Sequence, residues 1–236
     1  MLGKLARRVV KMAGLAFGGS CYLCRGAAEG PLCRDCDAEL PRLPPLLCPR
    51  CALASPAGAV CGRCLAQPPS FDATVAALAY EFPADVLVQA LKFRGELALA
   101  PLLAGLLAAR LPRGERVDYL LPVPLSAGRL RERGFNQALE IARHVASAAG
   151  CALAPHLAER ARDTPPQADL ALGERARNVR GAFRCPRPLG DAAVAVLDDV
   201  MTTGATLEEL AATLKRAGAS RVVNWVVART APPADA

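Results

Sequence analysis

Residues 194–206 read Val-Ala-Val-Leu-Asp-Asp-Val-Met-Thr-Thr-Gly-Ala-Thr, and this stretch is the most informative one on the fold. It opens with a short apolar run that is typical of a central strand in a parallel sheet covered on both faces. Beyond it, apolar residues recur at helical spacing, with acidic residues in the first turn and basic residues in the last: Leu207, Leu210, Ala211 and Leu214 form the apolar face. The sequence therefore predicts a buried strand, a turn, and a helix that begins near Thr206.

The residues between this strand and this helix suit a sugar that bears a phosphate. Asp198 and Asp199 stand at the carboxyl end of the strand, where open α/β sheets bind ligands, and carboxylates accept hydrogen bonds from vicinal hydroxyls. The amino end of the helix favours an anion, and Gly204 allows a positive φ. A Walker A loop and a G-x-G-x-x-G fingerprint are both missing from the sequence. A ribose 5-phosphate suits the stretch, and the alternative is a solvated strand end followed by a helix-capping turn.

Outside this stretch, strand patterns alternate with helix patterns. Strands are predicted over 71–82, 117–123, 152–157 and 222–228, and helices over 84–92, 96–111 and 137–149. Strands and helices that alternate in this way form a mostly parallel sheet with crossover helices on both faces. We therefore predict an α/β fold, with Trp225 of the last strand in its core.

Eight of the ten cysteines form four C-x-x-C pairs near the amino terminus, namely Cys21/Cys24, Cys33/Cys36, Cys48/Cys51 and Cys61/Cys64. Two such pairs supply four thiolates, which is the ligand set of a closed structural zinc site. The sequence thus predicts two zinc ions, bound by consecutive pairs or by interleaved ones. The alternative of a thioredoxin-like redox pair is disfavoured, because no β-α-β pattern surrounds the four pairs.

These patterns divide the 236 residues into three parts. We predict an amphipathic helix over 1–20, a tandem zinc module with two sets of four cysteines over 21–66 and an α/β domain over 70–232. No apolar stretch approaches the roughly 18 to 20 residues of a membrane-spanning helix. The basic start of the chain also lacks a signal-like core and cleavage site, so we expect a cytoplasmic protein.

The formal net charge of +7 is carried mainly by arginine. Between Ser126 and Arg187 the chain has 11 arginines against 6 acidic residues, an excess of five that suits a polyanion such as pyrophosphate or nucleic acid. Part of this region, between His156 and Phe183, shows no strong periodicity, and we interpret it as a lid over a leaving group. For each arginine singly, a solvated and salt-bridged surface position is the alternative.

The stretch 194–206 closely resembles the phosphoribosyl pyrophosphate (PRPP) signature of type I phosphoribosyltransferases. Together with the Cys pairs, five further motifs make the chain similar to ComF-type, competence-associated proteins, which are related to amidophosphoribosyltransferases: LKFRG at 91–95, PVPL at 122–125, RGFNQ at 133–137, TPPQ at 164–167 and RARN at 175–178. The resemblance spans nearly the whole chain. It implies a type I phosphoribosyltransferase-like, mostly parallel sheet flanked by helices, preceded by a small Cys-rich zinc module. It also implies a link to the uptake of transforming DNA as single strands.

The resemblance assigns roles to particular residues. It implies that Asp198 and Asp199 bind the ribose hydroxyls of PRPP, and that the loop of Thr202, Thr203, Gly204, Ala205 and Thr206 wraps the 5-phosphate. The turn of Pro122, Val123, Pro124 and Leu125 would face the pyrophosphate. Further candidates around the pyrophosphate and the lid are Arg133, Asn136, Gln137, Arg162, Gln167, Arg175 and, more weakly, Lys92. One Mg²⁺ would accompany PRPP and keep several of its waters.

Three functions follow, and the residues do not identify the acceptor of the ribosyl group. The first is Mg²⁺-assisted chemistry at ribose C1 of PRPP, in or near DNA uptake and with DNA-uptake proteins as partners. The second is a non-catalytic adaptor or single-stranded DNA-binding protein that retains a PRPP fold. The third is an orthodox purine or amide salvage phosphoribosyltransferase.

Overall fold

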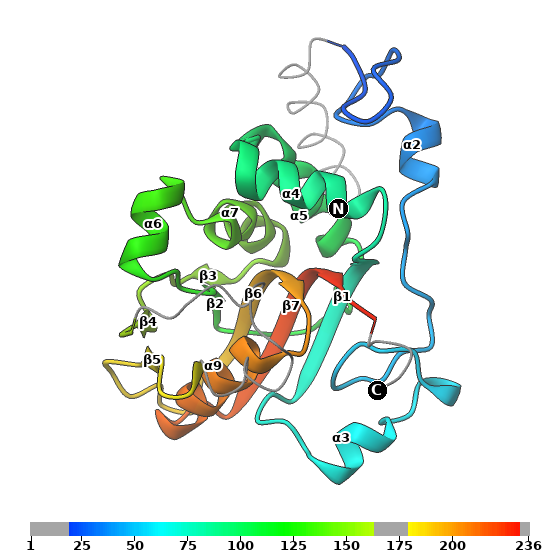
Figure 1. Ribbon diagram of the computed structural model, residues 1–236. Coiled ribbons are helices and arrows are strands. Elements are labelled where there is room, and N and C mark those ends of the chain that lie inside the picture. Colours follow the sequence, from blue (N-terminus) through cyan, green and yellow to red (C-terminus); the bar gives the residue numbers. More distant parts are fainter. Residues whose placement is uncertain (1–18, 163–178, 232–236) are drawn as a thin grey trace.

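A five-stranded sheet with the strand order β1-β7-β6-β2-β3 forms the centre of the computed structural model, which describes residues 19–162 and 179–231 (Figure 1). Its strands are β1 (Ala73–Ala79), β2 (Tyr119–Pro122), β3 (Ala152–Leu153), β6 (Ala193–Met201) and β7 (Arg221–Arg229). All four pairings in this sheet are parallel. The apolar run that opens the stretch 194–206 thus lies in the central strand β6, and the predicted α/β class is confirmed.

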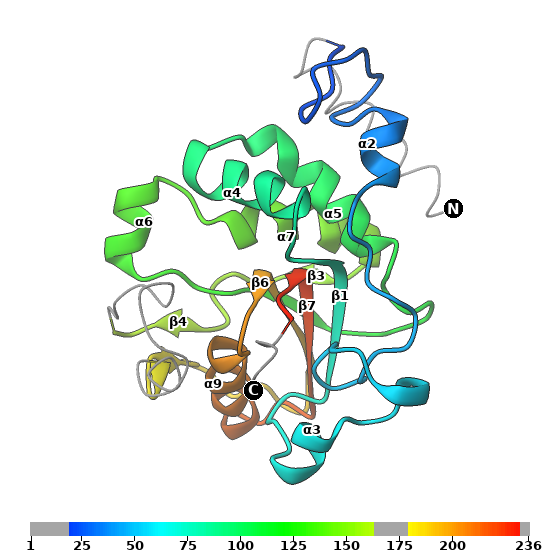
Figure 2. The same ribbon diagram turned by 45° about the vertical axis from the view of Figure 1, so that its right-hand side comes forward.

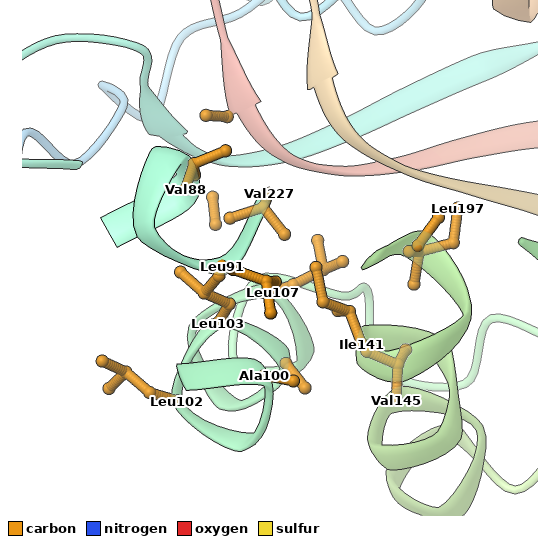
Figure 3. Close-up of a cluster of buried hydrophobic side chains, with 14 of the residues drawn as sticks. Val88, Leu91, Ala100, Leu102, Leu103, Leu107, Ile141, Val145, Leu197 and Val227 are labelled. Atoms are coloured by element: carbon orange, nitrogen blue, oxygen red, sulfur yellow. The ribbon is translucent and has the colours of Figure 1, made fainter. Parts of the chain in front are cut away.

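Helices cover both faces of the sheet. One face carries α4 (Ala84–Arg94), the short η2 (Leu97–Leu99), α5 (Ala100–Ala108) and α7 (Gln137–Ala149), and the other face carries α9 (Ala205–Arg216) (Figures 1 and 2). Figure 3 shows how leucines of α4 and α5 meet Ile141 of α7 and Leu197 of β6 in the first of two buried clusters. Trp225 belongs to this cluster and is 1% exposed, as predicted.

Most predicted elements differ somewhat in extent from those in the structure, and three of these differences bear on the site or have a clear physical cause. β6 continues to Met201, so Asp198 and Asp199 lie inside the last part of the strand instead of just after it. The strand predicted over 152–157 pairs with β2 at 152–153 alone, because Pro155 has no N–H to donate to a neighbouring strand. The helix predicted over 96–111 divides into η2 and α5, since Pro101 stands in the first turn of α5.

The structure also contains a helix and a small sheet that the sequence patterns do not predict. Helix α6 (Ala127–Arg133) begins at Ser126, whose hydroxyl accepts a hydrogen bond from the Arg129 N–H. The two-residue strands β4 (Glu159–Arg160) and β5 (Phe183–Arg184) form an antiparallel pair. Such short elements give too few residues for a periodic pattern to emerge.

The Cys-rich segment contains α2 (Arg34–Ala38), η1 (Pro56–Gly58) and α3 (Gly62–Ala66) and runs along edge strand β1 (Figure 2). Arg42 forms an antiparallel bridge with Leu78, and the Ala79 N–H donates to the Pro41 carbonyl at 2.7 Å. This segment therefore covers the free edge of the sheet. The helix predicted over 1–20 lies outside the described residues except for its last two positions. In the described ranges, none of the helices combines the length and the apolar character that crossing a membrane requires.

Candidate functional site

Two adjacent carboxylates lie at the carboxyl end of the central strand. Asp199 is 3% exposed and Asp198 is half-buried. Each carboxylate accepts a hydrogen bond from the next backbone N–H at 2.9 Å, Asp198 from Asp199 and Asp199 from Val200. These local hydrogen bonds fix the two side chains at the end of the sheet where the neighbouring parallel strands β7 and β2 also end.

Lys92 neutralises the buried carboxylate. Its Nζ lies 3.1 Å from Asp199 Oδ2, and the charge of Asp199 raises the pKa of Lys92. Burial alone would raise the pKa of Asp199, but the charge and the hydrogen bond of Lys92 lower it below the usual value. For Asp198, loss of hydration raises the pKa, and the Asp199 charge raises it further. The structure therefore gives Lys92 a more direct place in the site than its lone position late in a helix suggests.

The threonine- and glycine-rich loop after β6 leads straight into α9. Gly204 is the residue before the helix and has φ 87°, a conformation that favours glycine. The Thr203 hydroxyl accepts a hydrogen bond from the Ala205 N–H at 3.3 Å. Thr202, Thr203 and Thr206 are all half-buried. The loop thus ends at the amino terminus of a twelve-residue helix, an end that favours anions.

The 122–125 turn lies beside the carboxylates because β2 is the neighbour of β6. Pro122 is in register with Leu197, and the Val123 N–H donates to the Leu197 carbonyl at 2.9 Å. The Asn136 amide holds this turn from the other side, donating to the Val123 carbonyl at 3.0 Å. The oxygen of the same amide caps α7 by accepting from the Ala138 and Leu139 N–H groups. Asn136 thus fixes the position of the turn through backbone groups.

Arg133 and Gln137 complete this side of the site. Arg133 donates a hydrogen bond to Gln137, which is 4% exposed. Burial lowers the pKa of Arg133, and the charge of Asp199 acts in the opposite direction. The Arg133 guanidinium also lies 5.6 Å from the centre of the Phe93 ring, and Phe93 is 70% exposed. The sequence reading did not single out Phe93, although it adjoins Lys92 in the motif 91–95.

Of the residues predicted for the lid, Arg162 lies in the described part of the chain. Arg162 is exposed and donates to the Arg180 carbonyl at 2.9 Å, close to the β4–β5 pair. The Gly181 N–H donates to Glu209 on α9 at 3.0 Å. Gln167 and Arg175 lie outside the described residues.

Arg229 is a second residue that the sequence reading missed. It ends β7, is 2% exposed, and donates to the carbonyls of Met201 and Thr202 at the start of the loop. Burial lowers its pKa to about 10. The signal in the sequence is an arginine that directly follows the apolar run 225–228, at the same end of the sheet as Asp198.

The eight paired cysteines form two separate clusters, each with its four sulfur atoms within 4.8 Å of one another. The first cluster is Cys21, Cys24, Cys33 and Cys36, and the second is Cys48, Cys51, Cys61 and Cys64. In each cluster one Sγ–Sγ distance is 3.7 Å. Four sulfurs at about 2.3 Å from a zinc ion in a tetrahedron lie about 3.8 Å apart, so both clusters fit zinc. The quartets are consecutive, as the simpler of the two pairings predicts.

This chain is similar to one known domain family and to several known proteins. The sequence profile of the double zinc ribbon domain matches residues 12–65. DNA utilization protein YhgH of Salmonella typhimurium is 37% identical over 226 residues, which cover 92% of this chain and 99% of that protein. Competence protein F of Haemophilus influenzae is 30% identical over 226 residues, which cover 90% of this chain and 98% of that protein. Among solved structures, an allosteric regulatory enzyme of purine biosynthesis aligns with a TM-score of 0.35 and 20% identity, over 52% of this chain and 24% of that one.

Proposed function

Because this chain belongs to the ComF-type family of DNA utilization protein YhgH and competence protein F, we propose that it binds PRPP and acts at ribose C1 of that molecule. We further propose that it does so in the cytoplasm, in the utilization of DNA that the cell takes up. The names of the relatives support the biological setting, and the geometry of the site supports the ligand.

One observation carries the proposal on PRPP. Three features meet at the end of strand β6: the carboxylate pair, the amino terminus of α9 with Gly204 before it, and the 122–125 turn. Lys92 pairs with Asp199, and Asn136 holds the turn through the Val123 carbonyl. The half-buried Asp198 suits the ribose hydroxyls, which donate to carboxylates. The amino end of α9 suits the 5-phosphate, and the turn lies where the pyrophosphate would extend.

The chemistry follows from the charges around the sugar. When the bond from C1 to pyrophosphate weakens, positive charge develops on the ribose ring and negative charge on the leaving group. Asp198 and Asp199 would stabilise the first of these charges, while Lys92 and Arg133 would stabilise the second. PRPP would enter with Mg²⁺, which neutralises pyrophosphate oxygens and suits oxygen donors such as Asp198. The residues otherwise act by holding PRPP in a fixed orientation.

Calorimetry with PRPP and Mg²⁺ tests this proposal. Wild-type protein should bind PRPP, and the Asp198→Asn/Asp199→Asn variant should bind it at least about tenfold more weakly, or about 1.4 kcal/mol. Because neutralising Asp199 also removes the partner of Lys92, the single Asp198→Asn variant serves as the control with the ion pair intact. A wild-type protein that fails to bind PRPP would rule out the proposed ligand.

The exposed aromatic side chain beside the site favours single-stranded DNA as a second candidate ligand. Phe93 is flanked by two cations, with Arg133 5.6 Å and Lys92 Nζ 6.0 Å from the centre of its ring. An exposed ring among cations suits stacking of an unpaired base next to a phosphate backbone. This function predicts DNA binding that weakens steeply with salt and that Phe93→Ala reduces several-fold. Phe82→Ala is the matched control, since Phe82 is 78% exposed.

A further inference from the structure

A buried arginine joins the second cysteine cluster to the loop that follows β6. The Arg229 Nε donates to the carbonyl of Cys51, a ligand of that cluster, at 2.9 Å. Its Nη1 donates to the carbonyls of Met201 at 2.9 Å, Thr230 at 2.7 Å and Thr202. One guanidinium therefore holds backbone groups from three chain segments that are far apart in sequence.

The contact is well fixed because the arginine is buried and its Nε and Nη1 donors bond to backbone carbonyls. Arg229 is 2% exposed, and a guanidinium is planar, so its donors point in fixed directions. A shift of the Cys51 carbonyl would leave a buried N–H without a partner or displace the whole group. The Met201 and Thr202 carbonyls, where the loop begins, would move with the guanidinium.

Packing supports the same connection. Ala52, next to Cys51, is 1% exposed and belongs to the buried cluster that contains Met201 at the end of β6 and Leu207 of α9. The first cysteine cluster packs elsewhere: Tyr22 and Leu40 belong to the cluster formed with α4, α5 and α7. Residues beside the two cysteine clusters thus belong to hydrophobic cores on opposite faces of the sheet, and Ala52, beside the second cluster, shares its core with the end of β6 and with α9.

We propose that Arg229 is a positioning residue that makes the conformation of the Thr202–Thr206 loop depend on zinc at the second cluster. The loop is ordered for a phosphate when zinc fixes the Cys51 carbonyl, and it loses that order when the cluster is empty. Zinc at this cluster and PRPP at the loop therefore bind cooperatively, a consequence that rests on the proposed function. The first cluster has no such effect.

Hydrogen exchange on the full-length zinc protein tests the proposal without any ligand. In Cys61→Ser, which removes a ligand of the second cluster, the amides of residues 202–206 should exchange at least about tenfold faster than in wild type. In Cys33→Ser, the matched variant of the first cluster, they should exchange as in wild type. Arg229→Gln should reproduce the effect of Cys61→Ser while both clusters keep zinc. Equal exchange in Cys33→Ser and Cys61→Ser would overturn the proposal.

Zinc release from wild-type protein tests the same coupling if a cysteine variant folds poorly. Coupling free energies are reciprocal, so PRPP must retain zinc at the second cluster by the same factor by which that zinc strengthens PRPP binding. In equilibrium competition with a chromophoric chelator, PRPP and Mg²⁺ should raise the affinity of the protein for one of its two zinc ions at least about fivefold. Arg229→Gln should abolish this increase. PRPP binding with unchanged zinc release would contradict the coupling. If PRPP does not bind at all, the proposed function fails, and hydrogen exchange still decides the role of Arg229.

Discussion

At the scale of single residues, Lys92 determines how two neighbouring aspartates coexist at the end of β6. A buried carboxylate without a counter-charge is costly, and two adjacent ones repel each other. Lys92 keeps Asp199 ionised, while Asp198 carries the raised pKa of the pair. The two carboxylates thus differ in role: Asp199 is buried in an ion pair with Lys92, and Asp198 is partly exposed.

Replacing Lys92 tests this arrangement. Lys92→Met leaves Asp199, whose side chain is 4% exposed, without its partner, and should lower the free energy of unfolding by about 3 kcal/mol. The double variant Lys92→Met/Asp199→Asn should regain part of this loss, because it removes the uncompensated charge. Urea unfolding measures both. A loss below about 1 kcal/mol, typical of an exposed ion pair, would contradict the burial of this pair.

The raised pKa of Asp198 predicts a pH dependence of PRPP binding. Ribose hydroxyls donate best to the ionised carboxylate, so affinity is present above this raised pKa and is lost as pH falls through it. The loss should begin at a higher pH than the usual aspartate pKa implies. Asp199→Asn removes the neighbouring charge and should move the loss to lower pH.

Calorimetry across the acidic range measures this dependence. PRPP has ionisations of its own, and Asp198→Asn serves as the control because its profile contains those of the ligand alone. Superimposable profiles of wild type and Asp198→Asn would contradict the role of Asp198.

At the scale of elements, the start of α9 depends on the conformation of one glycine. Gly204 has φ 87°, and a Cβ at this position would lie 2.7 Å from the terminal methyl carbon of Met201. A side chain there would strain the backbone and push Met201 away from the loop. The loop and the helix terminus thus form one unit, whose shape Gly204 allows and whose start Arg229 holds.

Gly204→Ala should therefore impair binding more than stability. We expect a loss of about 1 kcal/mol in unfolding free energy from the positive φ and at least about a tenfold loss of PRPP affinity. Gly150→Ala is the matched control: Gly150 has φ 69° at the end of α7, and a Cβ added there would meet no atom within 4 Å. It should lose similar stability and keep its PRPP affinity. Equal affinity in both variants would argue against a binding role for the loop.

At the scale of the whole molecule, the two cysteine clusters extend the sheet domain along β1. The Ala79 and Thr74 N–H groups donate hydrogen bonds to the Pro41 and Pro49 carbonyls, which ties the segment to this edge. An open sheet edge is a template for unwanted pairing, and the segment covers it. We therefore expect zinc binding to stabilise the whole protein and not its amino-terminal part alone.

Metal analysis tests the two clusters. Wild-type protein should contain about two zinc ions per chain, and X-ray absorption should show four sulfurs at about 2.3 Å from each. Cys36→Ser and Cys64→Ser should each retain about one zinc ion, because they damage different clusters. Loss of both ions from either variant would mean that the quartets are not independent, and one ion or none in wild type would contradict the assignment.

Local pattern predicts much of this molecule, and long-range contacts account for the rest. Helix α7 has its predicted bounds, because Asn136 and Gly150 mark both ends and its apolar face is regular. Strand β6 extends beyond its predicted end at Leu197, because Asp198 and Asp199 have the pattern of a strand end although the neighbouring strand β7 continues beside them. The Lys92–Asp199 pair and the links of Arg229 join distant segments, and no local spacing reveals them.

We propose that PRPP binds across the end of β6, between the 122–125 turn and the start of α9. The most direct measurement is the change in backbone amide chemical shifts when ¹⁵N-labelled, zinc-loaded protein is titrated with PRPP and Mg²⁺. We predict the largest shifts at residues 198–206, with a second group at Val123 and Leu125, and their loss in Asp198→Asn/Asp199→Asn. Shifts that fall elsewhere in the molecule, or that persist unchanged in this variant, would contradict binding of PRPP at this site.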